Sequence, residues 1–144
     1  MNVPIEMKEG LEVARINSRA KGCRGEREFS RLCREEGYDG ARRGQQYSGI
    51  EGSDVVGLPF IHVEVKRVQA LNIEKAMDQS RRDRTGEQKP IVAHRKNDCK
   101  WLITMDAKQW FELYREYEMA RTSLEKTIRK QKEINRIMYI KPQQ

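Results

Sequence analysis

Apolar positions near the start of the chain recur at helical spacing. Residues 5–36 are expected to be mostly helical, with a break at the "KGCRG" of residues 21–25. Later in this segment an apolar stripe follows the period of one helix face, and its members are Phe29, Leu32 and Cys33. Gly37 comes soon after and suits a helix C-cap, so the helix is predicted to end there.

The middle of the chain alternates apolar and polar residues in the manner of strands. A short strand is expected over 38–43, followed by a long glycine-rich loop of the kind that is often functional in small domains. The runs over 53–58 and 60–68 are predicted to form a hairpin around a Gly-Leu-Pro turn. Two more strands are predicted over 90–95 and 100–105.

Two further helices are predicted. The first covers 72–84, with Asn72 as a plausible N-cap. The second starts after Asp106 and keeps apolar residues at spacings of three and four, at Trp110, Leu113, Tyr117, Ala120, Leu124, Ile134 and Met138, with Thr127 and Gln131 as interruptions. Its later part, residues 119–144, is longer than a small domain needs. It either pairs with something, for example a second copy of the chain, or is a solvated helical tail.

The order helix, strands, helix, two strands, helix predicts an α/β domain. Its centre is a mixed β-sheet flanked by helices, and a long C-terminal helix follows. With 144 residues the chain is long enough for one domain and one appendage. We assign the domain to residues 1–118 and the helical extension to the rest.

Composition narrows the class of partner. Charged residues make up 35% of the chain and the formal net charge is +7, which favours nucleic acid over a merely basic, soluble protein. No apolar run approaches the roughly 20 residues of a membrane span, and the N-terminus lacks a signal-peptide core. A cytoplasmic protein with no membrane partner is therefore expected. Three cysteines match no zinc or disulfide pattern and are expected to be free thiols: Cys23, Cys33 and Cys99.

Charged residues interrupt one predicted strand, the "IHVEVKR" of residues 61–67. Side chains in a strand alternate between two faces, so Glu64 and Lys66 share one face with His62. Asp54 starts the preceding strand, and a hairpin can bring its carboxylate beside Glu64. Two carboxylates so close repel each other unless a cation lies between them, and Mg²⁺ suits such oxygen ligands. Beside such a metal ion, Lys66 could hold a water nucleophile or stabilise charge on a phosphate.

Two residues of the predicted helices can complete this site. Glu26 lies at helical spacing before the apolar stripe and so faces the core, whereas Glu28 is turned nearly away. An inward carboxylate needs a partner, which a metal site between helix and sheet would supply. Gln79 lies on the helix after the charged strand and could hydrogen-bond a water or a phosphate, or could be an ordinary solvated residue.

A simpler interpretation is an ion pair between Glu64 and Lys66 on a wet edge strand. Taken alone, the two residues favour it. Asp54 and Glu26, present in the right order, shift the balance towards a metal site. For the two histidines, His62 and His94, a surface position is expected.

The segment "SDVVGLPFIHVEVK" resembles the metal-binding core of the PD-(D/E)xK nuclease superfamily. Asp54 matches the family Asp, Glu64-x-Lys66 matches its (D/E)xK, and Ser53 replaces the usual Pro. The segment "KGCRGEREFSRLCREEGY" resembles the first helix of archaeal-type Holliday-junction resolvases, in which the first Glu of Glu-Arg-Glu is an active-site acid, and this carries over to Glu26.

The likeness continues in the late strands "KPIVAHRK" and "KWLITM", so that it runs in order over residues 21–105. Phage-encoded members of the resolvase group are similar. The resemblance implies a restriction-endonuclease-like core and a homodimeric, Mg²⁺-dependent endonuclease that cuts branched DNA. Mn²⁺ would be able to substitute for Mg²⁺.

Basic and polar residues around the glycine-rich loop and the proposed site are candidate DNA contacts. One of them is a tyrosine that could stack on an unpaired base. The alternative is that these charges only keep the surface solvated. The candidates are Lys21, Arg24, Arg42, Arg43, Gln45, Tyr47, Arg67 and Arg81.

The leading hypothesis is therefore a metal-dependent DNA endonuclease of the resolvase type. Asp54, Glu64 and the Val65 carbonyl would bind Mg²⁺. Glu26 would complete the ligand shell directly or through water, and Lys66 would orient the attacking water. Two alternatives stay open: a nuclease of the same fold that acts on a mismatch, nick or restriction site, and a catalytically silent DNA-binding protein.

Overall fold

The computed structural model describes residues 5–44 and 52–140, with side chains from residue 19 onward. The chain forms two compact units, Met1–Asp106 and Ala107–Gln144. The expected end of the domain at residue 118 lies inside the second unit. Within the described residues, no helix is long and apolar enough to cross a membrane.

The first unit is built on a five-stranded mixed sheet whose strands lie side by side in chain order. Its strands are β1 (Arg42–Arg43), β2 (Val55–Val56), β3 (Ile61–Arg67), β4 (Lys89–Arg95) and β5 (Leu102–Met105). β3 and β4 run parallel, and every other neighbouring pair is antiparallel. β3 is therefore the central strand of the sheet.

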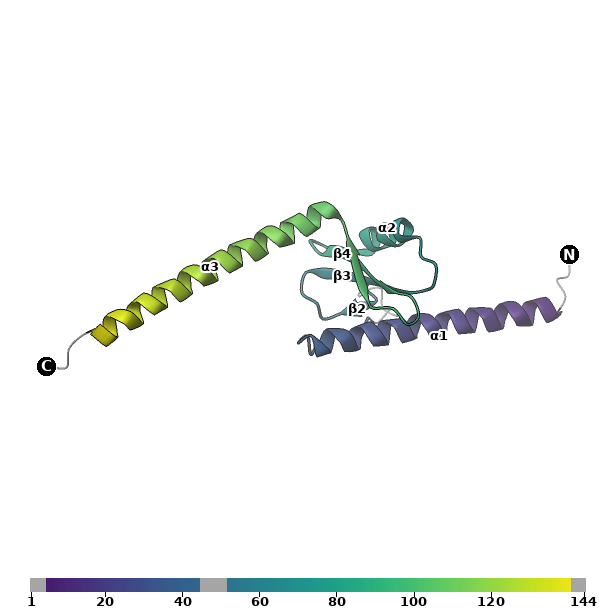
Figure 1. The fold of residues 1–144 in the computed structure, drawn as a ribbon. Helices are drawn as coiled ribbons and strands as arrows, with labels where there is room; N and C mark the ends of the chain where they lie inside the picture. The colour runs from purple at the N-terminus through teal and green to yellow at the C-terminus, as the bar shows by residue number, and fades with distance from the viewer. Residues whose placement is uncertain (1–4, 45–51, 141–144) are drawn as a thin grey trace. The chain divides into compact units, whose positions relative to one another are not determined.

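Two helices cover the two faces of this sheet (Figure 1). α1 (Ile5–Glu35) packs on one face, where Phe29 belongs to a buried cluster with alternate residues of β3 and β4. α2 (Ile73–Asp83) packs on the other face, where Met77 lies against Val92 of β4. The predicted α/β architecture, a mixed sheet flanked by helices, is confirmed.

The course of α1 differs in one respect from the prediction, because the helix is continuous through residues 21–25 and does not break. Gly25 serves close packing instead: a Cβ added there would lie 2.9 Å from the Cβ of Arg67, nearer than such atoms can approach. The predicted helix end is confirmed. Gly37 has a φ of 96°, and its N–H donates to the carbonyl of Arg34, as in a Schellman motif.

Other local signals also hold. Asn72 caps α2 as predicted, with its side-chain oxygen accepting a hydrogen bond from the N–H of Lys75 at 3.0 Å. The hairpin of β2 and β3 and the pairing of β4 with β5 are confirmed. The first strand is shorter than the predicted 38–43, because the N–H of Ala41 donates to the carbonyl of Tyr38 in a turn.

The second unit is a single helix, α3 (Ala107–Ile140), of 34 residues. It is the long C-terminal helix that the apolar spacing predicts. Near its start the rings of Trp110 and Tyr114 stack, with centroids 5.1 Å apart. None of its described side chains is buried.

Candidate functional site

The charges of "EVK" lie on the central strand and not on an edge. Glu64 is buried, with 3% of its surface exposed, on the sheet face that α2 covers. The wet edge strand of the simpler interpretation is therefore wrong, but its ion pair is confirmed, because the Lys66 ammonium lies 2.6 Å from Glu64 Oε1. Burying an ionisable pair inside a protein carries a desolvation cost, and an exposed ion pair contributes little to stability. Stability alone therefore does not explain why these charges lie on the central strand.

Asp54 is brought to Glu64 by the hairpin, as predicted. The N–H of Asp54 donates to the carbonyl of Val63 at 2.8 Å, and its Oδ2 accepts a hydrogen bond from the N–H of Val65 at 2.8 Å. Ser53, the residue before it, locks the same register by exchanging hydrogen bonds between its hydroxyl and the backbone of Val63. The Asp54 carboxyl group is thus held against the backbone of Val65, just beyond the short pairing of β2 with β3, and Asp54 is 8% exposed.

The two carboxyl groups interact electrostatically. Burial, and then the neighbouring Glu64 carboxylate, raise the pKa of Asp54 to about 7, against the opposing hydrogen bond from Val65. Burial also raises the pKa of Glu64, although Lys66 opposes this shift. Two buried carboxyl groups that interact in this way are more stable with a proton or a cation bound than as two neighbouring carboxylates.

Lys66 and Gln79 join the site from β3 and α2. The Lys66 ammonium lies 2.6 Å from Glu64 Oε1 and donates to Gln79 Oε1 at 3.1 Å. Lys66 is 28% exposed, so its amine lies where the buried carboxylates meet solvent. Gln79 is therefore not simply a solvated residue of α2, because its amide fixes the position of the amine.

Glu26 faces inward from α1 as predicted, and its partner is an arginine. The Arg43 guanidinium donates to Glu26 Oε2 at 2.6 Å and to the sulfur of Cys23 at 3.1 Å. The Glu26 charge still reaches the two buried acids, because it contributes to the raised pKa of both Asp54 and Glu64. Glu26 therefore lies at the margin of the site, held by an ion pair.

The prediction that Glu28 is turned nearly away from the sheet is wrong. Glu28 accepts a hydrogen bond from Arg67 at 3.0 Å and lies 3.7 Å from Arg95, with 19% of its side chain exposed. The close approach of α1 at Gly25 explains this, since both flanks of the helix come within reach of the strands.

His62 is a second correction, because it is fully buried and not on the surface. It shares the α2 face with Glu64, as strand alternation requires. Burial lowers the pKa of His62 although Asp83 opposes the shift, and within the described residues neither ring nitrogen has a hydrogen-bond partner. His94 is half-buried, with Nε2 at 2.9 Å from the hydroxyl of Thr104. Asp83, which the sequence analysis overlooks, also raises the pKa of Glu64.

The oxygen atoms at this site suit a magnesium ion that takes most of its ligands from water molecules. Within the described residues, no group of three or more His, Cys, Asp and Glu side chains is placed to hold a metal. Two carboxylates and a backbone carbonyl are nevertheless a sufficient protein contribution for Mg²⁺, which keeps several waters. The N–H and C=O of a strand residue point to the same side, so the Val65 carbonyl faces the Asp54 side of β3.

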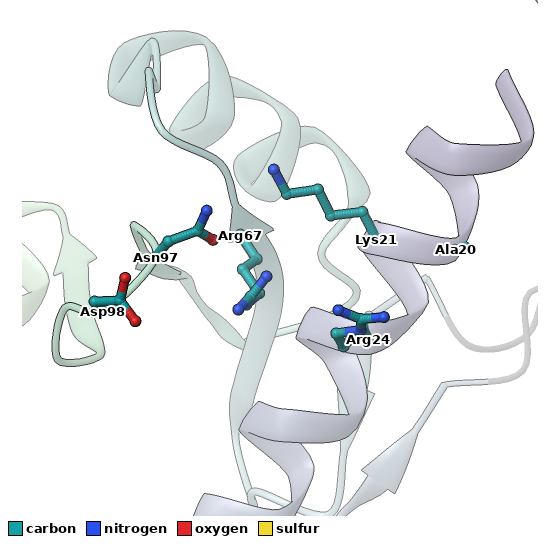
Figure 2. A pocket seen from close by; sticks show the side chains of 6 residues that line it. All are labelled: Ala20, Lys21, Arg24, Arg67, Asn97 and Asp98. Atoms are coloured by element: carbon teal, nitrogen blue, oxygen red, sulfur yellow. The ribbon is translucent and has the colours of Figure 1, made fainter. Parts of the chain in front are cut away.

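Three of the candidate DNA contacts line one basic cleft of about 510 Å³ (Figure 2). Lys21 and Arg24 extend from α1, and Arg67 extends from the end of β3 between them and the β4–β5 loop. Asn97 and Asp98 form the wall on the loop side. Arg67 follows Lys66 directly in the chain but points to the opposite sheet face, so the cleft and the buried carboxylates lie on opposite sides of β3.

The remaining candidates lie elsewhere. Arg81 on α2 is engaged by Asp106, at 2.5 Å, and by Asp78, at 2.7 Å, so it is not part of the cleft. Arg42 is exposed on β1. Gln45 and Tyr47 lie outside the described residues.

Gly44, the last described residue before the gap at 45–51, is hydrogen-bonded at the site. The N–H of Gly44 donates to the carbonyl of Asp54 at 2.9 Å, so the described residues on either side of the segment meet at the candidate metal ligand.

Comparison of the chain with family models, curated proteins and solved structures finds no match. The likeness to PD-(D/E)xK nucleases therefore rests on the residues named above and on where the fold brings them.

Proposed function

We propose that the protein is a metal-dependent DNA endonuclease that cuts branched DNA, in the manner of the resolvases it resembles. One observation carries the proposal: Asp54 and Glu64 are buried together beside Lys66 on the central strand of the sheet. Burial of two neighbouring carboxyl groups is costly, and perturbed acids with a specific cationic neighbour are common at catalytic sites.

Each residue has a defined part in this proposal. Asp54, Glu64 and the Val65 carbonyl would hold Mg²⁺ or Mn²⁺, which when bound lowers the pKa of water and stabilises charge on a phosphate. Gln79 holds the Lys66 amine beside Glu64, where it would orient the attacking water. Glu26 would act through water from its position on Arg43.

The basic cleft would bind the DNA backbone. Lys21 and Arg24 present two cations to a space that can admit a phosphate, and Arg67, whose guanidinium is paired with Glu28 at 3.0 Å, lines the same space. The net charge of +7 supports association with a polyanion.

Two broader features belong to the same proposal. A homodimer would bring two active sites to the two strands of a branched DNA. The enzyme would act in a reducing cytoplasm, where the thiols of Cys23, Cys33 and Cys99 remain free.

The decisive experiment compares a synthetic four-way junction with a linear duplex of the same sequence, with Mg²⁺ and with chelator. Paired, metal-dependent nicks near the branch point, absent from the duplex, are the expected result. Equal cutting of both substrates would retain the nuclease and remove the preference for branched DNA. Tight binding without cutting in any divalent metal would make the protein a DNA-binding protein only.

Two variants assign the activity to this site. Asp54→Ala should abolish cleavage and largely retain DNA affinity, because it removes a metal ligand and not a phosphate contact. Asp78→Ala is the matched control, because its carboxylate lies exposed on the outer side of α2. Cleavage by the Asp54 variant at the wild-type rate would refute the assignment.

A further inference from the structure

The apolar side chains of α3 lie exposed along one helix. Tyr117, Leu124, Ile134 and Met138 are all more than two fifths exposed. A solvated helical tail does not need such residues, and it does not need them at a regular spacing.

The spacing is that of a heptad repeat. With Tyr117 at position a, the a positions at steps of seven are Tyr117, Leu124, Gln131 and Met138. The d positions between them are Ala120, Thr127 and Ile134. Apolar residues occupy five of these seven positions across the three heptads from Tyr117 to Met138, and the two polar ones, Thr127 and Gln131, are neighbours in the seam.

The outer side of the same helix has the opposite character. The f positions, which point away from an a/d seam, are Arg115, Thr122, Arg129 and Arg136. All four are exposed. The helix thus has one seam suited to burial and one face suited to water.

We propose that α3 pairs with α3 of a second copy as a parallel, in-register, two-stranded coiled coil over residues 116–138. This inference rests on the dimer of the proposed function and not on its chemistry. It names the surface through which the two copies associate.

The polar residues of the seam favour a second copy of this chain as the partner. In a parallel, in-register pair, Gln131 meets Gln131 and Thr127 meets Thr127. Each side chain then finds a hydrogen-bonding partner inside the seam. An out-of-register pair, or an apolar partner helix, would leave the Gln131 amide buried without one, at a cost in free energy.

Charges beside the seam favour the parallel orientation. Glu116 at position g and Arg121 at position e lie five residues apart, which is the spacing of an attractive contact between parallel helices. An antiparallel pair can also match Gln131 with Thr127. That arrangement, however, brings Lys130 against Lys130 of the other chain, and like charges repel.

The parallel orientation determines at which end of the coil the two first units are attached. Each α3 begins at Ala107, immediately after the first unit ends at Asp106. Two parallel helices therefore begin at the same end of the coil, and both first units are attached there. Two active sites would then be available to one branched DNA.

The test of association uses the full chain without DNA or metal. Sedimentation equilibrium should show a dimer, and Leu124→Glu should raise its dissociation constant by at least ~100-fold, because it introduces two unpaired carboxylates into the seam. Thr122→Glu is the matched control, with the same charge on the outer face two residues away, and should leave association unchanged. Circular dichroism checks that the first unit stays folded in both.

Cross-linking tests the orientation. Ala120→Cys should form an intermolecular disulfide under mild oxidation, because residue 120 faces its own counterpart only in the parallel pair. Thr122→Cys on the outer face and the unsubstituted chain serve as controls, since Cys23, Cys33 and Cys99 are present in all three.

A monomeric chain, or a dimer that survives Leu124→Glu, would overturn the inference. So would a Thr122→Cys variant that cross-links as readily as Ala120→Cys. These readouts do not depend on cleavage, so a failure of the coiled coil and a failure of the nuclease proposal are separable.

Discussion

The ionisation of Asp54 conflicts with the fold. Its pKa of about 7 lies above the ordinary value of 3.8, chiefly because the carboxyl group is buried and faces Glu64. The native state therefore keeps a proton that the unfolded chain releases between about pH 4 and pH 7. Stability must fall as the pH rises through that window.

Removing the charge should relieve this cost. Asp54→Asn is expected to raise the free energy of unfolding by about 2 kcal/mol at pH 7.5 in metal-free buffer, and to raise it little at pH 4. Urea denaturation at the two pH values measures the difference. Mg²⁺ should then stabilise the wild-type protein at pH 7.5 and not the variant. A variant that is less stable than the wild type at pH 7.5 would make Asp54 a structural carboxylate.

The basic cleft makes a separate prediction about DNA affinity. If the cleft binds DNA as proposed, Arg24→Gln would remove one phosphate contact, so it should weaken binding and reduce the slope of log affinity against log salt by about 1. Fluorescence anisotropy over a salt series gives both quantities. Arg129→Gln on α3 removes the same charge from the second unit and should leave the slope unchanged. Equal slopes for the Arg24 variant and the wild type would exclude the cleft from the DNA path.

At the residue scale, part of the site was predictable because side chains alternate between the two faces of a strand. This alternation places Glu64 and Lys66 on one face, and the hairpin register then brings Asp54 to them. The burial of His62 was not predictable, because alternation shows which residues share a face and not what covers it. The pairing of Arg43 with Glu26 was equally hidden, since it joins β1 to α1 across 17 residues.

At the scale of elements, the packing of α1 on β3 positions both Glu26 and the basic cleft. Gly25 makes that packing possible, so Gly25→Ala should lower the free energy of unfolding by about 1–3 kcal/mol by forcing the helix outward. Gly22→Ala is a precise control on the same helix, because nothing lies within 4 Å of its added Cβ. It should instead stabilise the protein by about 0.5–1 kcal/mol through helix propensity. Thermal and urea denaturation compare the two, and equal effects would mean that Gly25 is not a contact point.

Element ends were predictable where the signal is local. Asn72 and Gly37 carry out capping roles that their residue types and positions indicate. The predicted break in α1 was wrong for a non-local reason: a glycine that permits close packing has the same sequence signature as one that ends a helix. The central place of β3 depends on its parallel pairing with β4, which strand periodicity does not reveal.

At the scale of the whole molecule, the apolar spacing of α3 predicts its length and helical form, but the helix itself does not show what its seam contacts. The proposed parallel coiled coil names one such contact: Glu116 of each chain would face Arg121 of the other. Within one helix, Arg121 also lies 3.7 Å from Glu125, in an exposed pair that contributes little.

A charge exchange distinguishes the contact between chains from the contact within one. Glu116→Arg alone and Arg121→Glu alone should each weaken the dimer by about threefold to tenfold, because like charges then face each other on both sides of the coil. The double variant should recover most of the loss, because the attraction returns with its polarity reversed.

Glu125→Arg, which disturbs only the pair within one helix, should change association less. Sedimentation equilibrium at low salt measures the dissociation constants of the wild type and the four variants, and the differences should shrink in 0.5 M salt as screening increases. Additive losses in the double variant would mean that the two residues do not meet, and that the helices do not pair in this register.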